Sequence, residues 1–134
     1  MRPVAGQEEE MDKSAACHQE VRELMQRFST VQGWALMSRD GIVMLAQLPP
    51  TVDEDFLGTL GAALISISDR WAESRSACAT EYILLGDCRY RHLFLPAGRE
   101  GILALFLDVK GDWNSVVAAS CMLAERMGQV LEQA

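Results

Sequence analysis

The chain has 134 residues, 49% of them apolar, so it can form one folded domain with a substantial core. Its formal net charge is −7, with 12 basic and 19 acidic residues, which argues against a nucleic-acid-binding surface because such surfaces are basic. No window reaches the roughly 18–20 apolar residues of a membrane span, and residues 1–10 lack the apolar block of a signal peptide. We therefore expect a cytoplasmic protein with no nucleic-acid partner and no membrane insertion.

The four cysteines are expected to be reduced. Cys17, Cys78, Cys88 and Cys121 form no C-x-x-C pair, and each lies within or beside an apolar pattern. Free cysteine is commonly a small core residue, and disulfides are rare in a reducing compartment.

The N-terminal part of the sequence predicts an acidic tail, a helix and a hairpin. Residues 1–11 are polar, include three consecutive glutamates and are expected to form a flexible acidic tail. From about residue 12 to 29, apolar residues recur at helical spacing; they are Cys17, Val21, Leu24, Met25 and Phe28. Two short apolar runs, 34–38 and 42–47, flank Asp40-Gly41, a dipeptide that favours a hairpin turn.

A second helix is predicted to follow Pro49-Pro50 and to end near Arg75. Thr51 and Glu54 have the spacing of a capping box, with Thr51 as the cap. The main apolar stripe of this helix is expected to pack in the core or in a dimer; it consists of Leu57, Leu60, Gly61, Leu64, Ile67, Ser68 and Trp71. A flanking strip with small residues would allow another backbone to approach closely; it consists of Gly58, Ala62, Ile65 and Asp69.

Three more strands and a last helix follow. Residues 81–96 indicate two short strands that turn at Gly86-Asp87, and residues 102–107 indicate a third. Because residues 102–107 are apolar without alternation, both faces of this strand should be buried, which places it mid-sheet. Residues 113–133 again have helical spacing.

Together these elements predict an α/β (α+β) sandwich with the order α-β-β-α-β-β-β-α. With the last strand at the centre and beside the first, the five-stranded, mostly antiparallel sheet has the order 2-1-5-4-3. We expect one helix on one face and two on the other, in a single domain over residues 12–133.

The third strand would then lie at an edge of the sheet. Its residues Tyr82, Ile83, Leu84 and Leu85 are too apolar for a free edge. Pairing with the same strand of a second copy about a two-fold axis removes this exposure. The strip Gly58, Ala62, Ile65 and Asp69 would cross the same axis, so we predict a homodimer whose interface contains both sets of residues.

The order of elements resembles the roadblock/dynein light chain family from about residue 21 to 131. The residues that carry the resemblance are the hairpin segment Trp34-Ala-Leu-Met-Ser-Arg-Asp-Gly-Ile-Val, then Leu48-Pro49, the helix start Val52-Asp53-Glu54 and the strand Ile102 to Leu107. Bacterial and archaeal members of the family resemble MglB, a dimeric regulator of a small Ras-like GTPase. The resemblance therefore implies a non-enzymatic signalling protein that dimerises and regulates a Ras-like small GTPase, with a helical face that meets it. Candidate contacts on that face are Asp55, Thr59, Ser66 and Glu73.

No catalytic, metal or cofactor site is indicated. Cys88 and His92 would lie roughly 13 Å apart along an extended strand, too far to share a hydrogen bond. Cys78, Cys88 and His92 match no zinc-ligand spacing, and the sequence contains neither a P-loop nor a G-x-G-x-x-G motif. We expect no enzyme activity and no cofactor.

Two other functions stay open. The first is a scaffold or signalling adaptor with no effect on GTP hydrolysis. The second is a small-molecule sensor, which would need a pocket with convergent polar groups.

Overall fold

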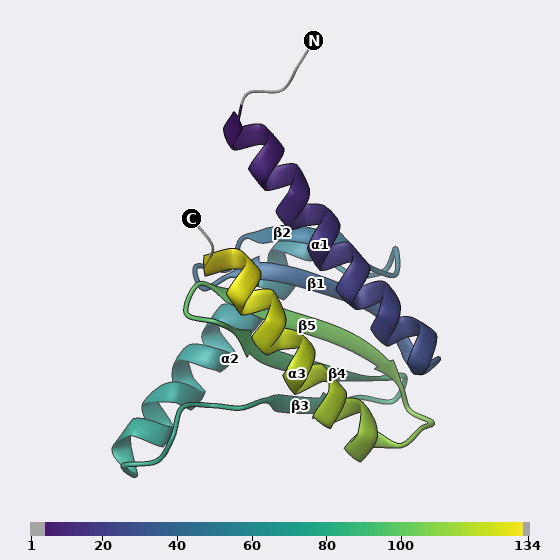
Figure 1. Ribbon diagram of the computed structural model, residues 1–134. Helices are drawn as coiled ribbons and strands as arrows, with labels where there is room; N and C mark the ends of the chain where they lie inside the picture. Colours follow the sequence, from purple (N-terminus) through teal and green to yellow (C-terminus); the bar gives the residue numbers. More distant parts are fainter. Residues whose placement is uncertain (1–4, 133–134) are drawn as a thin grey trace.

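The computed structural model describes residues 5–132, which form an antiparallel sheet between helices (Figure 1). The elements are α1 (Ala5–Arg27), β1 (Val31–Ser38), β2 (Val43–Gln47), α2 (Glu54–Ser74), β3 (Ile83–Gly86), β4 (Tyr90–Ala97), β5 (Gly101–Asp108) and α3 (Trp113–Glu132). The five strands have the order β2-β1-β5-β4-β3, and every neighbouring pair is antiparallel. This arrangement confirms the predicted fold class and strand order.

The sheet separates two apolar cores. On one face α1 and α3 pack against side chains such as Trp34, Leu103 and Leu105. On the other face α2 covers a smaller core that contains Met37 and Phe94. Residues 101–107 of β5 are all buried, as expected of a strand with apolar side chains on both faces.

The start of α1 differs from the prediction. The helix begins at Ala5 rather than near residue 12, so residues 5–11, expected as a flexible tail, are helical, while residues 1–4 lie outside the described part. Glu8 lies in the first turn, where a carboxylate interacts favourably with the positive end of the helix dipole. Polar composition alone therefore did not mark a disordered segment here.

The N-cap of α2 was also predicted wrongly. Asp53, not Thr51, is the cap, and its carboxylate accepts a hydrogen bond from the backbone N–H of Phe56 at 3.2 Å. Thr51 lies instead within a turn closed by a 3.1 Å hydrogen bond from the N–H of Val52 to the carbonyl of Pro49. That turn delays the helix until Glu54.

Candidate interaction surface

Helix α2 has a second apolar face that nothing in the described part of the chain covers. Leu57, Gly61 and Ile65 are buried toward the sheet. A separate row recurs at helical spacing on another side; we call it the outer stripe, and it consists of Phe56, Ala63, Ile67 and Trp71. Its three largest exposed side chains, Phe56, Ile67 and Trp71, are 67%, 66% and 64% exposed. Exposed apolar rows of this size mark interaction surfaces.

Strand β3 adds a short apolar edge. Its residues pair with β4 only, so among the described residues the other edge of β3 has no neighbouring strand. Tyr82, Leu84 and Leu85 are 45%, 38% and 37% exposed, whereas Ile83 packs partly into the core beneath α2. Figure 1 shows that β3 and the C-terminal half of α2 lie at the same border of the molecule.

The strip predicted to face a second copy is instead engaged within its own chain. Gly58 and Ile65 are buried, and a Cβ atom on Gly58 would collide with the backbone carbonyl of Gly41 in the β1–β2 turn. Ala62 also lies next to Gly41, and Asp69 is bonded to Arg39. Within the protomer, Gly58, Ala62 and Asp69 therefore hold α2 against the first hairpin, and Ile65 packs into the core beneath the helix.

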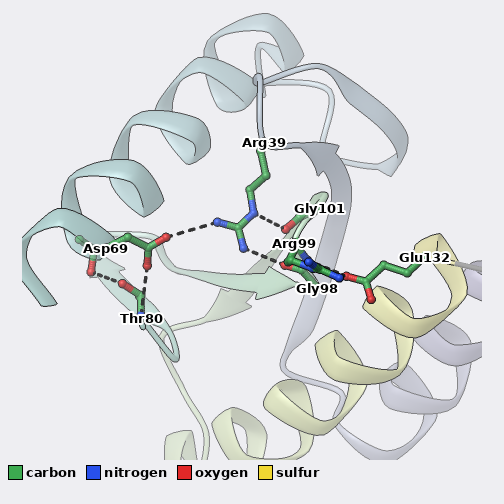
Figure 2. Close-up of polar contacts among 8 residues, drawn as sticks. Arg39, Asp69, Thr80, Gly98, Arg99, Gly101 and Glu132 are labelled. Atoms are coloured by element: carbon green, nitrogen blue, oxygen red, sulfur yellow. Dashed lines mark hydrogen bonds and ion pairs between the residues drawn. The ribbon is translucent and has the colours of Figure 1, made fainter. Parts of the chain in front are cut away.

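Arg39 connects three parts of the fold (Figure 2). Its Nε donates to the carbonyl of Gly101 at 3.1 Å, and its Nη2 donates to the carbonyl of Gly98 at 2.8 Å. Its Nη1 lies 3.4 Å from Oδ2 of Asp69, and both side chains are about one-third exposed. The guanidinium thus joins the end of β1 and the β4–β5 turn to α2.

Asp69 also fixes the segment that leads into β3. Its Oδ1 accepts a 3.1 Å hydrogen bond from the backbone N–H of Thr80, and Thr80 Oγ1 donates to Ser68 Oγ at 2.7 Å. The same carboxylate therefore sets the position of β3 relative to α2 (Figure 2). Sequence reasoning placed Asp69 on an interface and missed this role, because Arg39 is 30 residues away along the chain.

The predicted partner contacts Asp55, Thr59, Ser66 and Glu73 are all exposed on one polar side of α2. This side borders the outer stripe, and no buried side chain lies among the four. Thr59 Oγ1 donates to the carbonyl of Asp55 at 3.1 Å, one turn earlier in the helix. The side chains are thus available to a partner and carry two carboxylates.

His92 is held by Asp87. Its Nε2 lies 2.9 Å from Asp87 Oδ2, while Oδ1 of that carboxylate accepts hydrogen bonds from the backbone N–H groups of Arg89 and Tyr90. The Tyr90 bond, then the bond to His92 and the Arg89 bond, hold the pKa of Asp87 well below its usual range. The described residues contain no cluster of three or more His, Cys, Asp or Glu side chains that could hold a metal ion.

Cys17 and Cys121 lie against apolar surroundings, and burial raises the pKa of both thiols.

Across residues 5–132, no helix combines the length and hydropathy that crossing a bilayer requires.

Comparison with known proteins shows the fold. No protein-family model matches the chain. A structure described as MglB with tetrameric arrangement has a TM-score of 0.79 and 18% identity, and covers 90% of each chain. The gliding protein MglB from Thermus thermophilus has a TM-score of 0.77 and 18% identity, over 88% of this chain and 90% of that one. A Roadblock/LC7 domain from Streptomyces avermitilis has a TM-score of 0.72 and 21% identity, over 84% and 94%.

Among known sequences, the uncharacterized protein MJ0714 of Methanocaldococcus jannaschii is 28% identical over 86 residues, which are 64% of this chain and 72% of that protein. The chain has the roadblock/LC7 fold in its MglB-like form, so the predicted resemblance is confirmed at the level of the fold.

Proposed function

We propose that this MglB-like fold serves as a non-catalytic homodimeric platform that binds and regulates a Ras-like small GTPase. The observation that carries the proposal is that α2, which bears the exposed outer stripe, ends at the same border of the molecule as the unpaired β3 edge. Each is a surface that a single protomer leaves in water, and a two-fold axis would cover both at once.

In the proposed dimer, β3 pairs with β3 of the second copy, and the two sheets continue into one of about ten strands. The outer stripes then pack against each other on the α2 face, and Phe56, Ile67 and Trp71 supply most of the buried area. Burial of apolar surface contributes about 25 cal/mol per Å² removed from water, so three large side chains per protomer matter more than the short strand pairing.

The polar side of α2 is the proposed contact with the GTPase. Asp55, Thr59, Ser66 and Glu73 stay accessible when the outer stripes are paired. A dimer that binds one conformation of the GTPase switch loops more tightly than the other shifts the population toward it, and only that difference in affinity changes the rate of hydrolysis. The platform acts through the GTPase's own catalytic groups.

This mechanism needs no arginine finger from the platform. Arg39 is bonded to Gly98, Gly101 and Asp69 of its own chain. Arg75 stacks over Trp71 with its guanidinium carbon 5.6 Å from the ring centroid. Both cations therefore have roles within the protomer.

GTP turnover by the Ras-like GTPases of the same genome, each purified and measured with and without this protein, tests the function. Binding with a changed rate supports regulation, and binding with an unchanged rate supports the scaffold alternative. Glu73→Lys with Asp55→Lys should abolish the effect without changing the mass of the dimer. A strictly monomeric protein that binds none of these GTPases would contradict the proposal.

A further inference from the structure

A groove of about 650 Å³ opens on the α1 and α3 side of the sheet, on the face opposite α2. Its floor is the cross-strand pair Leu36 and Leu45, and Leu131 near the end of α3 also lines it. One wall is the N-terminal half of α1. Nothing in the dimer or in the GTPase contact uses this groove.

An irregularity in β2 brings Met44 into the lining. Leu36 pairs with Leu45, yet Met37 pairs with Val43, so β2 carries one extra residue, Met44. Val43 belongs to the core beneath α2, whereas Leu45 packs on the α1 side. The bulge thereby lets Met44 and Leu45 line the groove together, and a bulge is a common device for redirecting a side chain.

The wall formed by α1 is long enough to accommodate another helix. Its lining positions recur along one side of the helix; they are Gln7, Glu10, Met11, Lys13, Ser14 and Cys17. From residue 7 to 17 this side extends about 15 Å, or nearly three turns. In Figure 1 the N-terminal half of α1 projects past the sheet and past the end of α3, so no described helix lies along it.

The rims of the groove are apolar and adaptable. Met11 is 62% exposed and Met44 is 44% exposed, one on each side of the groove. Unbranched thioether side chains adjust to differently shaped apolar partners, and methionine-lined grooves commonly bind amphipathic helices.

The charge around the groove selects among occupants. Glu8, Glu9, Glu10 and Asp12 place four carboxylates beside one ammonium group, that of Lys13. Glu10 and Lys13 both line the groove, and the other three carboxylates belong to the same segment of α1, which has a net charge of −3. Phosphates, fatty-acid carboxylates and α1 of a second copy would all bring negative charge to this segment of net negative charge.

We propose that this groove binds a basic amphipathic helix of a partner protein. Apolar side chains of that helix would cover Leu45 between Met11 and Met44, and its lysine or arginine side chains would face Glu10 and the neighbouring carboxylates. The proposal does not depend on the dimer or on the GTPase.

The probe is a capped synthetic helix of three to four turns with leucine at positions i, i+3, i+4 and i+7 and lysine elsewhere, titrated against the full chain by calorimetry. We expect saturable binding with one peptide per protomer that weakens as salt is raised. Met44→Asp should weaken binding by about tenfold or more, and Glu10→Lys by about threefold or more with a smaller salt dependence. Met11→Asp repeats the test at a more exposed site if Met44→Asp fails to fold.

The matched control is Ile42→Asp. Ile42 is 66% exposed and lies just before β2, but it does not line the groove. It should leave peptide affinity unchanged. No binding, equal affinity for the same peptide with glutamate in place of lysine, or an equal loss in Ile42→Asp would overturn the proposal. A fatty acid that displaces the lysine peptide, or a drop in oligomeric mass caused by Met44→Asp, would overturn it in favour of an acyl chain or a second copy.

Discussion

The carboxylate of Asp69 lies 3.4 Å from the guanidinium of Arg39 and also accepts the backbone N–H of Thr80. One side chain therefore links α2 to the first hairpin and to the segment that leads into β3. The two surfaces proposed to dimerise, the outer stripe and the β3 edge, depend on this link for their relative position.

Asp69→Ala should weaken dimerisation and lower the free energy of unfolding by about 1 kcal/mol, since the bonds are partly exposed and water replaces them in part. Asp69→Asn is the matched control, because its amide oxygen still accepts from Thr80 while the charge is lost. Urea unfolding and sedimentation of both variants check this. Equal effects of the two substitutions would show that the ion pair, and not the Thr80 bond, positions β3.

Ile67→Asp should convert the protein to a folded monomer, because it places a charge at the centre of the outer stripe without touching either core. Met122→Asp is the control, since Met122 on α3 is 62% exposed against 66% for Ile67. Light scattering gives the mass of each variant, and circular dichroism confirms that each is folded. A dimeric Ile67→Asp variant would place the interface elsewhere.

Gly58→Ala should lower the free energy of unfolding by about 1–3 kcal/mol, because the added Cβ meets the backbone of Gly41 and either α2 or the turn must move. Gly6→Ala in α1 is the opposite case, since a Cβ there has no atom within 4 Å, and alanine favours a helix over glycine by up to about 1 kcal/mol. Thermal and urea unfolding measure both. A neutral Gly58→Ala would mean that α2 does not approach the turn as closely as described.

Asp87→Asn should be less stable than the wild type at neutral pH and should converge with it in acid. The folded pKa of Asp87 is lowered, so its ionised form stabilises the fold. That contribution is complete above the unfolded pKa of ~3.9 and disappears as pH falls further toward the folded pKa. Urea midpoints of both proteins from neutral pH into strong acid measure the difference, which would stay constant if Asp87 did not titrate with folding.

The strand order could be predicted because one strand left little choice. Residues 102–107 are apolar on both faces, and only a central position buries both. By contrast, the free face of α2 could not be identified from the sequence. The helix carries apolar residues around more than half of its circumference, and periodicity alone grouped Ile67 and Trp71 in one stripe with the buried Leu57.

Contacts between residues far apart in the sequence determine which face of α2 is buried and which is free. Gly41 and Arg39 come from the hairpin, and their contacts with Gly58 and Asp69 rotate the small-residue strip of α2 inward. Such pairings across the chain leave no local pattern. The turn at Pro49 likewise moved the N-cap from the predicted Thr51 to Asp53.

In the proposed homodimer, two copies associate through the outer stripe and the β3 edge. Sedimentation equilibrium at micromolar concentration tests it most directly, with the wild type, Ile67→Asp and Leu84→Lys measured side by side. We predict about twice the protomer mass of 14.8 kDa for the wild type and the single protomer mass for both variants. A wild type that stays monomeric, or variants that stay dimeric, would contradict the account.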